Sequence, residues 1–164
     1  MSWGEPRTKT VTWWWPGGLS EEIGQLTGID YLQGMIAGRF PPPPFASTFG
    51  VRLVAVAPGE AVFRCAPDES LLNPVGLVHG GVLSTLLDSA MGVAVQTEVD
   101  ARVGYATIEL KVSFLRPLPI DGQEIEVRGR TLKVGRKIAF AEAHAYDGSE
   151  RLLGHATSSL ARIG

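Results

Sequence analysis

The chain has 164 residues, a length that fits a single domain with its own hydrophobic core and needs no disulfide or metal to stabilise it. Hydrophobic residues make up 45% and charged residues 20%, which argues against extensive disorder. The 15 Lys and Arg residues against 17 Asp and Glu give a formal net charge of -2, so the chain lacks the basic excess of proteins that bind nucleic acids or anionic membranes.

Cys65 is the single cysteine, which excludes an intramolecular disulfide and a cysteine-based zinc site and favours a cytoplasmic location. The three histidines, His79, His144 and His155, lack the spacing of metal ligands, so we predict neither a metal nor a cofactor. The sequence has no apolar window of about 18 residues, and its N-terminus lacks the apolar run of an export signal. We therefore expect no membrane partner and no nucleic-acid partner.

Residues 1–44 are predicted to form a helical N-terminal extension that ends in a proline-rich spacer. A Ser-Glu-Glu sequence at 20–22 predicts the start of a short helix that ends near Gly28. Asp30 is expected to cap a second short helix over 31–37, and the four consecutive prolines that follow predict a stiff spacer. The three consecutive tryptophans near the start are expected to pack against a sheet or a second subunit.

Residues 45–164 carry the pattern of an antiparallel sheet with one long helix, and we expect them to form the main domain. The apolar segment over 81–95 has no interior proline, and its length predicts a helix rather than a strand. Residues 107–115 alternate between apolar and polar side chains, which predicts a half-buried strand. The other predicted strands cover 51–56, 61–65, 123–130, 131–134, 137–146 and 151–161. This is an α+β layout in which the sheet must wrap the helix to bury it.

A narrow stripe of small polar residues interrupts the apolar surface of the predicted helix. Its members recur at steps of three and four residues: Ser84, Thr85, Asp88, Ser89, Gly92 and Gln96. Asp88 is an ionisable group in apolar surroundings, where a charge is costly unless the carboxylate is hydrogen-bonded or used in function. We interpret Asp88 as a candidate catalytic group. The alternative is that the stripe faces solvent or fills a packing gap.

The predicted helix begins at the sequence His79-Gly80-Gly81. The first backbone N–H groups of a helix have no partner inside it, and with the helix dipole they can polarise a carbonyl or hold an oxyanion. Glycine at Gly80 and Gly81 removes the side chain that would keep a substrate away. The alternative is that the two glycines only make a sharp turn into the helix.

Asp88 lies eight residues beyond Gly80, and at a rise of about 1.5 Å per residue the two positions are roughly 12 Å apart along one helix. This distance is too large for both groups to act on one carbonyl. If both serve the same substrate, Asp88 of one subunit must meet Gly80 of another across a two-fold axis. The sequence therefore predicts a site that is shared in a homodimer.

Three ordered segments carry a resemblance to a known family: Asn73-Pro-Val-Gly-Leu-Val-His79-Gly80-Gly81, then Val-Leu-Ser-Thr-Leu-Leu-Asp88, and later Thr107-Ile-Glu-Leu-Lys-Val-Ser-Phe-Leu-Arg-Pro117. In these segments the chain resembles the hot dog fold thioesterases of the phenylacetate-pathway (PaaI-like) type. The resemblance implies an antiparallel sheet wrapped around a central helix. It also implies hydrolysis of acyl or aryl coenzyme A thioesters in sites shared between two subunits, in a homodimer or a homotetramer built from two dimers.

The resemblance also implies roles for individual residues. Asp88 matches the family's catalytic carboxylate, and the backbone N–H of Gly80 matches the donor that polarises the thioester carbonyl. Asn73 matches a polar side chain that helps to place the nucleophile or water, and Thr107 matches a hydroxyl residue near the carboxylate. His79 matches a loop histidine that supports the loop or contacts the thioester.

The candidate patch for the nucleotide end of coenzyme A is Arg136 and Lys137, with Arg116 as a third cation. Arginine can hold a phosphate through two parallel hydrogen bonds, and lysine offers a point charge. The alternative is a solvated hairpin tip whose charge serves solubility.

Taken together, these residues predict an acyl-coenzyme A thioesterase in which Asp88 activates water as a general base or attacks the carbonyl directly. Coenzyme A is then part of the substrate and not a cofactor. The alternative is a non-catalytic sensor that binds acyl-coenzyme A in the same cleft. A hydratase or dehydratase would need a different acid and base arrangement, and the Gly80-Gly81 sequence argues against it.

Overall fold

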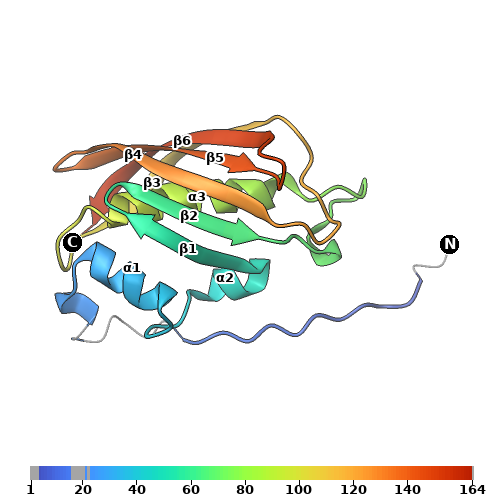
Figure 1. Cartoon of the computed structure of the whole chain (residues 1–164), viewed down its shortest axis with the longest axis horizontal. Coiled ribbons are helices and arrows are strands. Elements are labelled where there is room, and N and C mark those ends of the chain that lie inside the picture. The colour runs from blue at the N-terminus through green and yellow to red at the C-terminus, as the bar shows by residue number, and fades with distance from the viewer. Residues whose placement is uncertain (1–3, 16–20, 22, 164) are drawn as a thin grey trace.

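The computed structural model describes residues 4–15, 21 and 23–163 as a six-stranded antiparallel sheet that curves around one long helix (Figure 1). The strands lie side by side in the order β1-β2-β4-β5-β6-β3, so β1 and β3 form the two edges of the sheet. The predicted α+β fold, with its sheet wrapped around a central helix, is confirmed.

The strands are β1 (Val51–Ala57), β2 (Glu60–Cys65), β3 (Gly104–Phe114), β4 (Ile125–Val134), β5 (Ile138–Tyr146) and β6 (Leu152–Ile163). The helices are α1 (Gly28–Ile36), α2 (Pro44–Phe49) and α3 (Gly80–Gln96), with short 3-10 turns η1 (Ile23–Gln25) and η2 (Glu69–Leu71). Among the described residues, none of these helices is long and apolar enough to cross a membrane.

The helix α3 forms the centre of the core because apolar side chains cover most of its circumference. Its buried residues are Val82, Leu83, Leu86, Leu87, Ala90, Met91, Ala94 and Val95. The inner face of β5 carries a row of buried alanines at every second position: Ala139, Ala141, Ala143 and Ala145. In the neighbouring strand, a Cβ on Gly129 would lie 2.1 Å from the backbone oxygen of Ala90. Small residues on the sheet therefore allow α3 to approach its backbone closely.

The strand predictions are confirmed for the hairpin of β1 and β2, which turns at Gly59 with a φ of 75°. The sequence predicts a break between residues 130 and 131, and this prediction is wrong because β4 continues to Val134. The pairing of β4 with β5 shifts register between Thr131 and Lys133. Such a bulge interrupts the alternation of side chains without ending the strand, which explains the misleading pattern.

The N-terminal elements differ from prediction in three ways. Where the sequence predicts a helix that ends near Gly28, the described residues hold only the 3-10 turn η1, and α1 begins at Gly28. Thr27 caps α1, since its hydroxyl accepts a hydrogen bond from the Asp30 N–H at 3.3 Å, so Asp30 lies inside the helix instead of capping it. The sequence did not predict α2, which begins with Pro44 at its first position and ends at Gly50 with a φ of 68°. Of the helix start predicted at 20–22, residues 20 and 22 lie outside the described residues.

The edge strand β3 is less buried than its alternating pattern suggests. Leu110 and Val112 pack against the core, whereas Ile108 is 60% exposed and Phe114 is 57% exposed. The tryptophans at 13–15 are also exposed, so the packing against the sheet that we expected for them is not observed within the chain. Several large apolar side chains thus remain on the surface of the single chain.

Residues 4–15 run as an extended segment along the molecule (Figure 1). The segment is held near η2, because Lys9 Nζ lies 2.6 Å from Asp68 Oδ2 and Arg7 pairs with Glu69. The hydrogen bonds from Lys9 and then Ser70 lower the pKa of Asp68 to about 2. The division into an extension over 1–44 and a main domain over 45–164 stays a prediction.

Candidate active site

Asp88 lies in the middle of α3 as a half-buried residue, and Thr107 of β3 contacts it. The Thr107 Oγ1 donates a hydrogen bond to Asp88 Oδ1 at 2.7 Å. The hydroxyls of Ser84, Thr85 and Ser89 each donate to a backbone carbonyl one turn earlier in α3. The hydroxyls of the polar stripe are therefore satisfied within the helix, while its carboxylate is turned toward β3.

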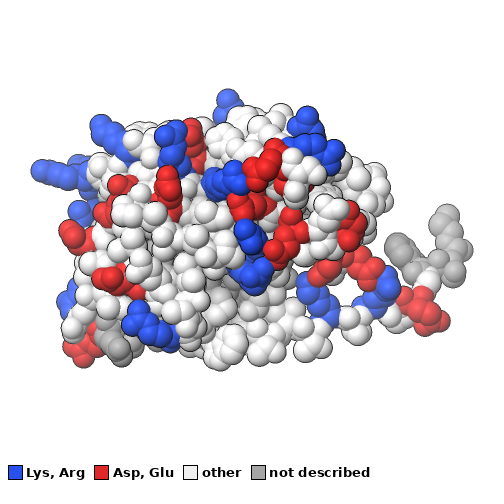
Figure 2. Space-filling view, viewed as in Figure 1, with Lys and Arg blue, Asp and Glu red and all other residues white. Residues whose placement is uncertain are grey.

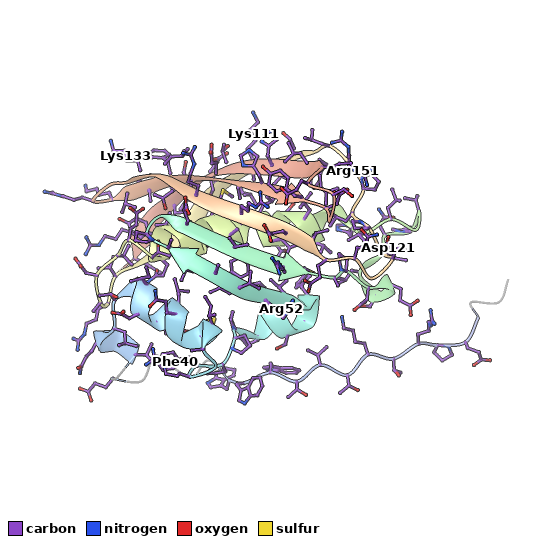
Figure 3. All side chains as sticks on the ribbon, viewed as in Figure 1. Phe40, Arg52, Lys111, Asp121, Lys133 and Arg151 are labelled. Atoms are coloured by element: carbon purple, nitrogen blue, oxygen red, sulfur yellow. The ribbon has the colours of Figure 1, made fainter. Side chains whose placement is uncertain are left out.

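A cavity of about 480 Å³ opens beside this carboxylate, and we call it the Asp88 cavity. Its walls are mostly apolar, and they combine α1, the proline segment, β1 and the second half of α3. Leu32 and Met35 of α1 contribute to the wall, as does Pro43. Arg52 of β1, labelled in Figure 3, also lines the cavity and pairs with Glu124. The sequence reasoning missed this wall, because α1 meets α3 only in the folded chain.

A second cavity of about 370 Å³ lies at the N-terminus of α3, and we call it the Gly80 cavity. Asn73, His79, Gly80 and Arg116 all line it. The Asn73 Oδ1 accepts hydrogen bonds from two backbone N–H groups of its own loop, at 3.0 and 3.1 Å. In the single chain, Asn73 therefore shapes the loop that leads into the helix.

His79 caps α3 through its side chain. Its Nδ1 accepts a hydrogen bond from the Gly81 N–H at 2.9 Å, which places the proton of the neutral ring on Nε2. A Cβ on Gly81 would lie 2.9 Å from the same Nδ1, so glycine at this position makes room for the cap. Within the described part of the chain, the Gly80 N–H has no acceptor. This donor is therefore available to a bound molecule.

The Asp88 cavity and the Gly80 cavity share no lining residue. The structure brings Asp88 together with Thr107, and it separately brings Asn73 together with His79 and Gly80. It does not bring the two groups to one cavity. Each chain thus carries two separate cavities, one at the N-terminus of α3 and one beside its middle and second half.

The predicted phosphate-binding cations lie in different places. Arg136 and Lys137 are exposed in the turn between β4 and β5, and they line neither of the two cavities. This turn is tied to the Asp88 cavity by Tyr105, a lining residue whose hydroxyl donates to the Gly135 carbonyl at 2.6 Å. Arg116 lines the Gly80 cavity and donates to a backbone carbonyl of β6. The three cations therefore do not form one patch within a single chain.

Other chemically reactive residues are placed away from these cavities. Cys65 is buried, and burial followed by the nearby Asp68 raises the pKa of its thiol to about 11. A thiol with such a pKa is a poor nucleophile near neutral pH. His144 stacks on His155 with ring centroids 6.0 Å apart, and no three His, Cys, Asp or Glu side chains within the described residues are close enough to hold a metal.

The charged surface shows no patch of a single sign on the face drawn in Figure 2, where Lys and Arg are interspersed with Asp and Glu. Ion pairs also join charged side chains of β4 to neighbouring segments: Arg130 pairs with Glu142 of β5 at 2.6 Å, and Arg128 pairs with Glu150 of the loop after β5 at 2.8 Å. Exposed pairs of this kind contribute little to stability individually. This face therefore offers no broad attraction for a polyanion.

The comparisons with known proteins bear on the family of the chain. The model of the Thioesterase superfamily matches residues 75–153, a range that includes Gly80, Asp88 and Thr107. A thioesterase family protein from Silicibacter pomeroyi is 30% identical in sequence, with a TM-score of 0.71 over 80% of this chain and 98% of that protein. The chain belongs to the thioesterase superfamily.

The chain is also similar to two further proteins. A phenylacetic acid degradation-related protein of Ralstonia eutropha is 28% identical, with a TM-score of 0.72 over 80% of this chain and 98% of that protein. Acyl-coenzyme A thioesterase 13 of Mus musculus is 31% identical over 56% of this chain and 64% of its own length. The chain thus spans just under two thirds of that relative. The resemblance to hot dog fold, PaaI-like thioesterases is confirmed for the family and the fold.

Proposed function

We propose that the protein hydrolyses acyl or aryl coenzyme A thioesters to the free acid and coenzyme A. The observation that carries this proposal is the Asp88 carboxylate, which is held by Thr107 beside an apolar cavity in a chain of the thioesterase superfamily. The carboxylate can accept a proton or attack a carbonyl carbon, and the cavity offers apolar walls to an acyl group.

In this proposal Asp88 acts by one of two routes. As a general base, it takes a proton from water, and the water oxygen attacks the thioester carbonyl to form a tetrahedral intermediate that expels the coenzyme A thiolate. As a nucleophile, it forms an acyl anhydride and releases the thiolate, and water then opens the anhydride to give the free acid. The thiolate leaves without a dedicated general acid because the pKa of a thiol is about 8.5.

The proposed oxyanion donor is the Gly80 N–H, which has no acceptor among the described residues. It would hold the carbonyl oxygen as negative charge develops there. Because Gly80 and Asp88 line different cavities, both can serve one thioester only when a second copy places the start of its α3 against Asp88. The proposed active unit is therefore a homodimer, alone or paired into a tetramer.

The remaining candidate residues have supporting roles in this proposal. Asn73 and His79 hold the loop that presents Gly80, as their hydrogen bonds to loop and helix N–H groups suggest. Arg116 and the turn that carries Arg136 and Lys137 would bind the phosphates of coenzyme A, which is part of the substrate rather than a cofactor. Gly81 would leave space for the thioester.

The decisive experiment measures the release of free thiol from a panel of acyl and aryl coenzyme A thioesters. We expect turnover by the wild type and a loss of kcat of about 100-fold to 10,000-fold in Asp88→Asn, because asparagine neither accepts the proton nor attacks the carbonyl. Asp121→Asn is the matched control, since Asp121 is an exposed loop residue far from Asp88 along the chain. Its kcat should equal that of the wild type.

Equal rates for the wild type and Asp88→Asn would refute the proposed role of Asp88. Tight retention of acyl-coenzyme A by the wild type without any turnover, measured by calorimetry beside the thiol assay, would instead favour the non-catalytic sensor. Addition of water to an enoyl thioester would favour a hydratase.

A further inference from the structure

Gly92 lies in the interior of α3 without a packing reason to be glycine. Glycine is less favourable than alanine inside a helix, so an interior glycine usually marks a close approach of other atoms. Gly129 of strand β4 shows such a close approach, because a Cβ there would meet the Ala90 backbone. A Cβ on Gly92 would meet no heavy atom within 4 Å. The space beside Gly92 is open.

This open space is part of the Asp88 cavity. Gly92 follows Asp88 by one helical turn and lines the same cavity wall. It also lines a neighbouring cavity of about 620 Å³, which we call the distal cavity and which extends along α3 to Gln96. Met35 of α1 lines both cavities from the opposite side. Gly92 and Met35 therefore lie where the two cavities adjoin, and we call this place the passage.

We infer that Gly92 and Met35 set the length of the acyl group that the protein accepts, and that the acyl group is a medium or long straight chain. This inference rests on the proposed thioester hydrolysis at Asp88. With its carbonyl beside Asp88, a chain runs past Gly92 toward Gln96, a path of about 12 Å along the helix axis. The Gln96 Nε2 donates to the Val103 carbonyl at 3.3 Å, so this polar group is satisfied without a ligand.

The walls that the two cavities share favour a flexible apolar chain over a charged or strongly polar acyl group, while the charged Asp100 and Arg102 line the distal cavity alone. Leu32, Pro43 and Val93 line both the Asp88 cavity and the distal cavity, and each presents apolar atoms to the passage. A single aromatic ring would occupy only part of the Asp88 cavity and would leave the distal cavity unused. The N-terminal extension thus contributes to the selection of substrate through α1.

The test compares acetyl, octanoyl, dodecanoyl, palmitoyl and phenylacetyl coenzyme A. The wild type should have its highest kcat/KM on octanoyl or dodecanoyl thioesters. Gly92→Ala should lower the ratio of kcat/KM for dodecanoyl over acetyl by about tenfold, and Gly92→Leu should lower it by about a hundredfold, because each fills the passage. Met35→Ala should raise the ratio for palmitoyl over octanoyl by about tenfold, since it widens the passage.

The control is Gly148→Ala, the same substitution at a turn glycine that lines neither cavity and whose Cβ would lie 3.5 Å from its nearest neighbour. It should leave every ratio unchanged. Thermal unfolding and the mass in solution are measured for each variant, and Gly92→Ala should unfold at or above the wild-type midpoint because alanine favours the helix.

Three results would overturn the inference. The first is an equal loss on all acyl groups in Gly92→Ala, and the second is a lower unfolding midpoint or a changed mass in that variant. The third is a wild type that hydrolyses thioesters but prefers acetyl or phenylacetyl groups. A wild type that hydrolyses no thioester would instead refute the proposed function itself.

Discussion

The Asp88 cavity and the Gly80 cavity differ in what they offer a substrate. The Asp88 cavity has a carboxylate and deep apolar walls. The Gly80 cavity has an available backbone N–H and Arg116, but no Asp or Glu lines it. The start of a helix supplies N–H groups and the positive end of the dipole, whereas its middle supplies side chains only. Each cavity therefore lacks what the other has.

Within one chain, the length of α3 keeps the Gly80 N–H apart from the Asp88 carboxylate. A donor and an acid on the same helix cannot converge when they are eight residues apart. If two chains associate with their α3 helices antiparallel, the Gly80 N–H of each chain would meet the Asp88 carboxylate of the other. Such a dimer would have two complete sites. The predictions below test whether the two cavities are halves of one site.

After the loss of Asp88, the largest effect is expected from Gly80→Pro, which removes the N–H from the Gly80 cavity. Proline is favoured at the first position of a helix, and His79 before it already has the extended backbone that proline requires, with a ψ of 135°. We expect kcat to fall by roughly 100-fold to 1,000-fold, the usual effect of losing an oxyanion donor. Steady-state thiol release measures this change.

The control for this variant is Gly80→Ala, which keeps the N–H. Its Cβ would lie 3.2 Å from the ring of Phe114, so it reproduces the crowding that proline introduces. If Gly80→Ala loses as much activity as Gly80→Pro, crowding and not the lost donor explains the effect.

The next prediction is a gain of activity when two inactive variants are combined. It tests directly whether the Asp88 cavity of one chain meets the Gly80 cavity of another. Coexpression of Asp88→Asn with Gly80→Pro should restore about a quarter of the wild-type activity, because half of randomly formed dimers are mixed and each mixed dimer has one intact site. Thiol release from the purified mixture measures the recovery. If the mixture is no more active than its two components, the cavities do not form a shared site.

A smaller effect is expected at Thr107, which holds the Asp88 carboxylate by a hydrogen bond of 2.7 Å. Thr107→Val keeps the shape of the side chain but removes the donor, so kcat should fall by about tenfold. Thr107→Ser keeps the hydroxyl and should restore most of the activity. Loss of activity in both variants would mean that the methyl group, and not the hydrogen bond, positions Asp88.

The smallest effect concerns the cap of α3. His79→Ala removes the acceptor of the Gly81 N–H, and the free energy of unfolding should fall by about 1 kcal/mol. Urea denaturation measures this loss, and His79→Asn should recover it because asparagine caps helices well. Normal activity in His79→Asn would limit His79 to a capping role, whereas a persistent loss of activity would assign the imidazole a direct contact with the thioester.

The sequence was sufficient to predict α3 and the separation of Gly80 from Asp88 along it. The apolar run over 81–95 is long and unbroken, and helical spacing alone separates Gly80 from Asp88. The contact between Thr107 and Asp88 was expected from family resemblance, since nothing in the local pattern around Thr107 indicates which helix residue it meets. The local sequence pattern thus predicts helices and strands, and the family motif adds one contact between them, that of Thr107 in β3 with Asp88 in α3.

The apolar wall contributed by α1 could not be predicted in this way. Met35 and Gly92 are more than 50 residues apart, and only the folded chain places them along one passage. Similarly, alternation along β3 predicts two faces but not its position at the sheet edge. The bulge of β3 between Thr107 and Glu109 also interrupts the alternation at Ile108, which is exposed despite its place in the apolar pattern.

The row of alanines on β5 restricts where new selectivity can arise. A larger side chain at Ala141 or Ala143 would push α3 away from the sheet, because both alanines are almost fully buried. The helix has no spare volume beside these alanines, so changes that reshape the pocket must come from the residues that line it, among which residues 28–46 form a wall of their own. Exchange of that segment between related chains should alter substrate preference while preserving the folded framework.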